Sequence, residues 1–131
     1  MYMLDTNICI YVLKNRSKRL RQKFKTEKEL CISSVTYAEL CFGIENGAPQ
    51  LRNARWEQLD LFTRLLHVEP LDWDAGPFYG RLRTWLKNQG KPIGNNDLFI
   101  ASHALSMGAT LVTNNKREFD RVPDLLVENW V

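Results

Sequence analysis

The chain has 131 residues, the length of one domain, and its 44% apolar and 11% aromatic residues suffice to fill a core. No apolar run is long enough to span a membrane, and no signal segment opens the chain. The three cysteines lack the spacing of a zinc site or a C-x-x-C pair. We therefore expect one domain over residues 1–131, located in the cytoplasm and independent of membranes.

The net charge of +3 is small but unevenly distributed. Seven basic residues and no acid lie between Lys14 and Lys25, so this segment carries +7 and the rest of the chain −4. Such a segment suits RNA, whose phosphates would contact residues such as Arg19, Arg21 and Lys23. The alternative is a helix face that is simply exposed to water.

Apolar runs separated by polar or glycine-rich segments predict alternating strands and helices. In chain order we expect a strand at 1–4, helices at 7–14 and 17–24, a strand at 30–33, a helix from 36 to the breaker cluster at 46–49, a helix at 50–66, a strand at 67–71, a helix from 74 to 89, a helix at 97–107, a strand at 109–113, a polar turn at 114–119 and a strand at 125–127. This alternation predicts an α/β fold with a parallel central sheet flanked by helices.

Acidic or amide residues lie where predicted strands end or the neighbouring helices begin: Asp5, Glu39, Asp97, Asn115 and Glu118. Asp5, for example, directly follows the apolar run 1–4. Because the carboxyl ends of parallel strands share one edge of the sheet with the starts of the helices, these residues are expected to converge there.

Each acid also has a simpler explanation when it is taken alone. Asp5 is a favoured N-cap for the helix after it, and Thr36 with Glu39 has the S/T-x-x-E spacing of a capping box. Asp97 suits the first turn of a helix, and Glu118 suits an exposed turn. The coincidence of four such positions on one sheet edge favours a shared site.

Clustered carboxylates at a sheet edge suit a particular chemistry. Carboxylate and amide oxygens are the ligands that Mg²⁺ and Mn²⁺ prefer. Hydrolysis of a phosphodiester needs a nucleophilic water and relief of charge on the phosphoryl oxygens, and divalent ions supply both. The sequence therefore predicts Mg²⁺-dependent phosphodiester cleavage, with Mn²⁺ as a substitute, carried by Asp5, Glu39 and Asp97.

Four segments resemble a known family in order and spacing: MLDTNICIYVLK at 3–14, ISSVTYAEL at 32–40, PIGNNDLFIASHAL at 92–105 and LVTNNKREFDRVPDL at 111–125. Together they resemble the PIN domain over nearly the whole chain, and specifically the VapC toxins of bacterial toxin–antitoxin pairs. Within that group, the likeness is greatest to the initiator-tRNA-specific endonucleases.

The resemblance implies roles for individual residues. Three residues fall on the family's acidic metal-binding positions: Asp5, Glu39 and Asp97. Many members have a fourth acid after the V-T strand, whereas this chain has Asn115 there and Glu118 nearby. Asn7 and Thr113 match polar positions that support the acids by hydrogen bonding.

The resemblance also implies a substrate and partners. It implies a toxic endoribonuclease that cleaves a structured RNA, the initiator tRNA in its anticodon region. A VapB-type antitoxin would neutralise it by laying its tail across the active-site groove. A homodimer is expected, together with a toxin–antitoxin hetero-oligomer that binds operator DNA through the antitoxin.

Other classes of function differ in what they require of the sequence. A non-cleaving PIN-like module that binds RNA or a protein partner needs no set of ionised acids, so the presence of Asp5, Glu39 and Asp97 weighs against it. A phosphatase with an aspartate nucleophile requires D-x-D, whereas Asp5 is followed by Thr6 and Asn7. The chain is also too short for the DNA-gripping elements of a flap-type nuclease.

Overall fold

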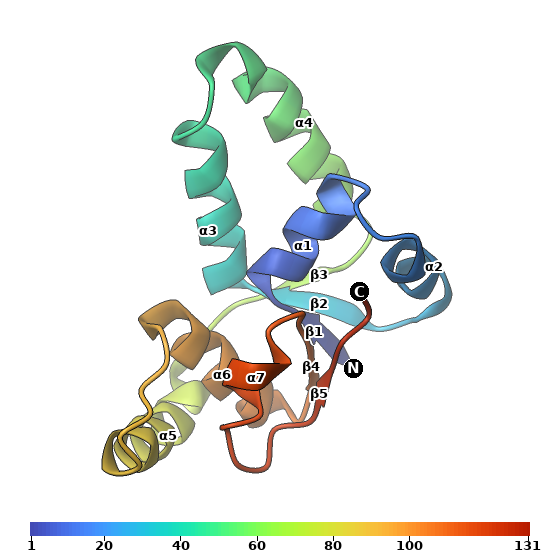
Figure 1. Ribbon diagram of the computed structural model, residues 1–131. Coiled ribbons are helices and arrows are strands. Elements are labelled where there is room, and N and C mark those ends of the chain that lie inside the picture. Colours follow the sequence, from blue (N-terminus) through green and yellow to red (C-terminus); the bar gives the residue numbers. More distant parts are fainter.

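A five-stranded, fully parallel sheet forms the centre of the computed structural model, which describes residues 1–131 (Figure 1). Its strands, in spatial order, are β3 (His67–Glu69), β2 (Leu30–Ser33), β1 (Tyr2–Leu4), β4 (Thr110–Val112) and β5 (Val127–Glu128). The first strand of the chain therefore lies in the middle, hydrogen bonded to β2 on one side and β4 on the other. The predicted α/β fold with a parallel central sheet is confirmed.

Helices cover both faces of this sheet. One face carries α1 (Thr6–Leu13), α2 (Lys18–Thr26), α3 (Ser34–Glu45) and α4 (Arg52–Thr63), and the other carries α5 (Gly76–Asn88), α6 (Asn95–Met107) and α7 (Lys116–Phe119). Two 3₁₀ turns precede α4 and α5, η1 (Pro49–Leu51) and η2 (Trp73–Ala75). In Figure 1, α3 and α4 form a hairpin that extends away from the sheet. No helix is long and apolar enough to cross a lipid bilayer.

Successive strand residues point to opposite faces and so form two apolar clusters. Met3 and Leu111 belong to the cluster beneath α5 and α6, while Leu4 and Val112 belong to the cluster beneath α1 to α4. All four side chains are fully buried, as expected for a parallel sheet that is covered on both faces. The strands are short, so most of the buried apolar surface comes from these two helix–sheet interfaces.

The start of α3 differs from the capping-box hypothesis. Ser33 is the N-cap, and its hydroxyl accepts a hydrogen bond from the Val35 backbone N–H at 3.1 Å. Thr36 is therefore buried inside the helix, and Glu39 in the second turn points away from the cap toward Thr6 of α1. The capping-box hypothesis was wrong because three residues with hydroxyl groups, Ser33, Ser34 and Thr36, lie close together in the sequence here. Ser33 becomes the N-cap because β2 ends at that residue.

Several other boundaries differ from the sequence prediction; for example, α6 begins at Asn95 and not at Asp97, and β3 ends at Glu69 and not at residue 71. The helix expected at 50–66 begins as the 3₁₀ turn η1, with its proline in the first turn where no N–H is needed. Asp74 does not cap a helix; Asp72 accepts a hydrogen bond from its N–H at 2.7 Å and starts η2 instead. The turn expected at 114–119 contains the short helix α7.

Replacing Leu111 with alanine tests the core beneath the central sheet. The side chain is fully buried, so its loss leaves a cavity, and we expect the free energy of unfolding to fall by about 2–5 kcal/mol. The control is Leu126→Ala, because Leu126 is 67% exposed and should change this free energy by no more than about 0.5 kcal/mol. Urea titrations followed by circular dichroism measure both variants, and equal losses would contradict the assigned core.

Candidate active site

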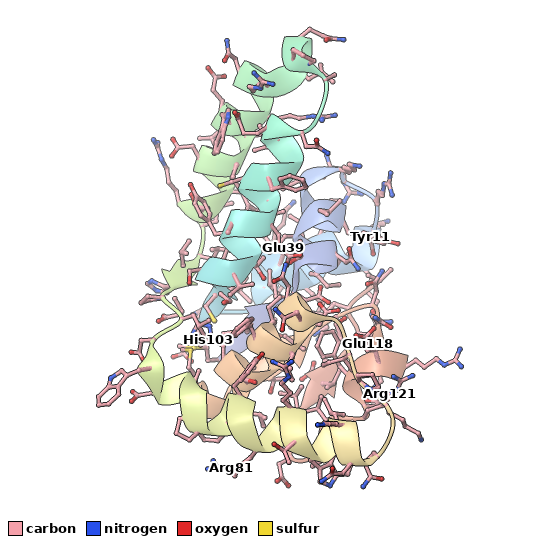
Figure 2. The ribbon with its side chains drawn as sticks, turned by 90° about the vertical axis from the view of Figure 1, so that its left-hand side faces the viewer. Tyr11, Glu39, Arg81, His103, Glu118 and Arg121 are labelled. Atoms are coloured by element: carbon pink, nitrogen blue, oxygen red, sulfur yellow. The ribbon has the colours of Figure 1, made fainter.

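The carboxyl edge of the sheet brings together acidic residues from four separate parts of the chain. Asp5 follows β1, Glu39 lies on α3 after β2, and Glu118 lies on α7 after β4. Asp97 is in the first turn of α6, which begins at the same edge. In Figure 2, the labelled Glu39 and Glu118 lie where the α3 side of the molecule meets α6 and α7. The four carboxylates therefore form one acidic cluster, and we use that name for them below.

Asp5 is the most buried member of the acidic cluster, at 3% exposure. Its Oδ1 accepts a hydrogen bond from the Ile8 backbone N–H at 2.9 Å, so it caps α1. Burial raises the pKa of Asp5 to about 6, and the charge of Glu39 adds to this, while hydrogen bonds from Thr113 and from the Ile8 and Asn7 backbones oppose it. Both explanations considered for Asp5, a helix N-cap and a member of a shared acidic site, are therefore correct, because one side chain fills both roles.

Glu39 is held by a hydroxyl pair between α1 and α3. The Thr6 hydroxyl donates to Glu39 Oε1 at 2.6 Å and lies 3.3 Å from the hydroxyl of Thr36. This arrangement fixes the carboxylate over the end of β1. Sequence reasoning missed the role of Thr6, although its place directly after Asp5 was a signal.

Asp97 carries the strongest electrostatic perturbation in the acidic cluster. Burial raises its pKa to about 7, and the charges of Glu118, Asp5 and Glu39 add to the effect in that order. A carboxylate at the N-terminus of a helix is ordinarily favoured in its charged form. At Asp97 burial and the neighbouring acids instead favour the neutral form.

Asn115, at the position where the resemblance implies a fourth acid in many members, orients another acid. Its amide Nδ2 donates to Glu118 Oε2 at 2.9 Å, and its backbone N–H donates to Thr113 Oγ1 at the same distance. The other oxygen of Glu118 accepts from the Gly94 backbone N–H at 3.4 Å. The structure therefore places Glu118, rather than Asn115, as the fourth carboxylate of the cluster.

The two residues that were predicted to support the acids, Asn7 and Thr113, differ in how they contact the cluster. The Asn7 side chain is exposed and makes no hydrogen bond, so only its backbone N–H supports Asp5. Thr113, by contrast, is fully buried beneath the cluster and contacts it directly through its hydroxyl. The supporting position predicted at Asn7 is thus filled by a main-chain group, whereas that at Thr113 is filled by the side chain.

The basic segment lies on α2, which packs against α1 on the side away from α3 (Figure 1). Arg19 and Arg21 are exposed. Lys23 is partly engaged, with Nζ 3.6 Å from a Glu27 oxygen and 5.8 Å from the centre of the Trp130 ring. The assignment of this segment to RNA binding stays a prediction.

His103 links α6 to the end of β2 and lies outside the acidic cluster. It is buried on α6, and its Nδ1 lies 2.9 Å from the hydroxyl of Ser33, the residue that caps α3. Burial lowers the pKa of His103, so the ring is neutral at pH 7 and accepts or donates through a fixed contact. The contact ties the second half of α6 to the start of α3.

The chemistry of the donor set in the cluster fits a divalent cation. No three of these side chains lie close enough to enclose an ion as they stand. Burial and, after it, the neighbouring acids raise the pKa values of Asp5 and Asp97, and a cation would favour the charged forms of both. All four acids offer hard oxygen ligands, the type that Mg²⁺ and Mn²⁺ prefer.

Comparison with known proteins places this geometry in a family. The PIN domain model matches residues 2–125. The structure also superimposes on VapBC2 from Rickettsia felis bound to promoter DNA, with a TM-score of 0.90 and 40% identity over 99% of this chain and 98% of that one. It superimposes equally well on DNA-bound VapBC from Salmonella typhimurium, with a TM-score of 0.93 and 37% identity over 99% and 98% of the two chains.

Curated relatives narrow the assignment further. Ribonuclease VapC2 of Rickettsia felis is 41% identical over 99% of this chain and 98% of its own length. The tRNA(fMet)-specific endonuclease VapC of Shigella flexneri is 42% identical over 98% and 97%. The chain therefore belongs to the PIN-domain family and, within it, to the VapC ribonucleases, which confirms the resemblance seen in the sequence.

The raised pKa values of Asp5 and Asp97 predict how stability depends on pH. Both lie above the ordinary value of 3.8, so between about pH 4 and pH 7 the folded state binds more protons than the unfolded state. The free energy of unfolding of the metal-free protein should therefore fall as the pH rises through this range. Asp97→Asn should flatten this fall and raise the melting temperature at pH 8.

Thermal melts in a chelator across a pH series measure this effect. The control is Asp124→Asn, which neutralises an exposed acid in the loop before β5 and keeps a residue type that tolerates its positive φ of 67°. A pH dependence that is the same in wild type and Asp97→Asn would show that the pKa of Asp97 is not raised in the folded protein.

Proposed function

We propose that this chain is a toxic Mg²⁺-dependent endoribonuclease that cleaves initiator tRNA in its anticodon region and is neutralised by a VapB-type antitoxin. The observation that carries the proposal is the acidic cluster, in which four carboxylates of a VapC-like chain meet at one sheet edge with raised pKa values for Asp5 and Asp97. A binding module has no use for such mutually repelling groups.

The residues of the cluster have separable roles in this proposal. Asp5, Glu39, Asp97 and Glu118 would hold the metal, which supplies a nucleophilic water and neutralises charge on the phosphoryl oxygens when bound. Three of these acids are oriented before a metal binds. The Ile8 N–H holds Asp5, the Thr6 hydroxyl holds Glu39, and the Asn115 amide holds Glu118. Asp97 depends most on the ion, because its pKa near 7 leaves it partly protonated until a cation arrives.

The relatives support the choice of substrate and its location. Those from Shigella flexneri and Salmonella typhimurium are both named tRNA(fMet)-specific endonucleases, and each covers nearly all of this chain. We extend that substrate to this protein, and with it a site of action in the cytoplasm, where tRNA is found. Mn²⁺ is expected to substitute for Mg²⁺ because both prefer oxygen ligands.

A cleft next to the cluster suits the antitoxin. It has a volume of about 340 Å³ and lies between α1, α3 and α4, with apolar residues along it and Glu39 at one edge. A groove of this kind accepts the apolar face of an amphipathic helix. Because Glu39 lines this cleft, the antitoxin residues that adjoin the bound helix would reach the acidic cluster. The VapBC relatives in complex with DNA support an antitoxin partner and an assembly that binds operator DNA. We propose in addition that the toxin is a homodimer and that the antitoxin makes the DNA contacts.

Neutralising one acid of the cluster tests the catalytic part of the proposal. We expect Asp5→Asn and Asp97→Asn each to lower the rate of initiator tRNA cleavage by at least roughly 100-fold, more than the removal of a group that only orients a metal ligand costs. Cleavage of transcribed tRNA in Mg²⁺, resolved on denaturing gels, gives the rates, and Asp124→Asn is the control. Full cleavage by either variant, or by wild type in chelator, would refute the metal-dependent site.

Filling the cleft tests the assignment of the antitoxin. Gly43 of α3 lines it, and a Cβ added there meets no atom within 4 Å. Gly43→Phe should therefore leave cleavage intact but weaken inhibition by the antitoxin, whereas Gly43→Ala should be inhibited normally. Titration of the antitoxin against tRNA cleavage measures both, and equal inhibition of the two variants would exclude this cleft.

A further inference from the structure

A second basic segment leads directly into the helix that carries Asp97. Between Asp74 and Asp97 the chain has no acidic residue and four basic ones, Arg81, Arg83, Lys87 and Lys91. None of the four lies within 4 Å of a carboxylate oxygen. This segment forms α5 and the loop that leads into α6, so it ends at the N-terminus that carries Asp97.

Two of these basic residues line a cleft between α5 and the start of α6. The cleft has a volume of about 570 Å³, and its lining combines apolar residues such as Leu86 and Ile93 with Arg83, Lys87 and Asn95. Arg83 and Lys87 are exposed and one helical turn apart, so they lie on the same face of α5. No acidic residue lines the cleft.

Hydrogen bonds connect Arg83 to the first residue of α6, the helix that carries Asp97. Arg83 Nη1 donates to the Tyr79 hydroxyl at 2.9 Å, and that hydroxyl donates to Asn95 Oδ1 at 3.3 Å. The Tyr79 ring stacks on Phe99 with centroids 4.5 Å apart, which fixes it against α6. Asn95 begins the helix whose third residue is Asp97. The Arg83 guanidinium is thus held in place relative to the cluster.

We propose that this cleft binds the ribose-phosphate backbone of the RNA substrate next to the scissile bond, with Arg83 and Lys87 contacting phosphates. The proposal rests on the ribonuclease function proposed above. The acidic cluster repels a polyanion, so the substrate needs a positive surface that leads up to it. The cleft provides two unpaired cations, an apolar floor on which a ribose or base can rest, and continuity with the helix that carries Asp97.

The double variant Arg83→Gln/Lys87→Gln tests this assignment by single-turnover cleavage of initiator tRNA. We expect the enzyme concentration at half-maximal rate to rise several-fold, while the maximal rate stays within about twofold because phosphate contacts position the substrate. The slope of log affinity against log salt concentration should become shallower by about one unit for each phosphate that is no longer neutralised. Tyr79→Phe keeps the ring but releases Arg83, so it should show a smaller rise.

The control is Lys28→Gln/Arg64→Gln, which also removes two exposed positive charges, in segments that lead into the amino ends of β2 and β3. Its half-maximal concentration and salt slope should match those of wild type. Gel filtration of each variant confirms an unchanged oligomeric state. A shallower slope in the cleft variant alone supports the assignment.

Two outcomes would overturn the proposal. One is a cleft variant with the same half-maximal concentration and salt slope as wild type. The other is a change of both quantities in Arg19→Gln/Arg21→Gln/Lys23→Gln but not in the cleft variant, which would assign the substrate to α2. If wild type does not cleave the tRNA, the proposed function fails instead, and the salt slope of tRNA binding in chelator still tests the cleft.

Discussion

Electrostatic repulsion among four carboxylates is the constraint on which the rest of this structure depends. Acids so close together would separate if their backbones were free, so each has to be carried by a rigid element. The central strands supply that rigidity, because β1 lies between β2 and β4 and its residues Met3 and Leu4 are buried on opposite faces. The favourable burial of apolar surface beneath the edge offsets the unfavourable charge upon it.

Neutral groups do the orienting at this edge. A threonine hydroxyl holds Glu39, an asparagine amide holds Glu118, and main-chain N–H groups hold Asp5. No lysine or arginine forms an ion pair with any of the four acids. A fixed cation would neutralise the cluster permanently and compete with a metal, whereas neutral donors fix its geometry and leave its charge available.

Much of this arrangement could be predicted from the sequence. The apolar runs marked the strands, and a carboxylate at the end of a buried run identified the functional edge, because a charged group is tolerated there and not inside. The order of strands in space gave no local signal, since the central place of β1 depends on which helices cover which face. The role of Asn115 was missed for a related reason: its partner Glu118 faces it only once α7 forms.

The basic face of α5 shows a different limit of sequence reasoning. The segment at Lys14–Lys25 stood out because its charges are dense, whereas Arg83 and Lys87 are separated by Thr84, the exposed Trp85 and the buried Leu86. Their shared direction follows from the helical period, and their nearness to Asp97 follows from the packing of α5 on α6. Charge density along a chain and charge density in space are therefore different quantities.

The double role of Asp5 has a consequence for how a bacterial lineage can escape the toxin. Loss of Asp97 relieves repulsion and disturbs no cap, so an inactive protein of that kind stays folded and can still occupy its antitoxin. Loss of Asp5 to most residues also relieves repulsion, but it removes the N-cap of α1, which costs about 1 kcal/mol and offsets part of that gain. An inactive protein that has lost Asp97 is therefore the more stable decoy for the antitoxin, and one that has lost Asp5 is more open to degradation.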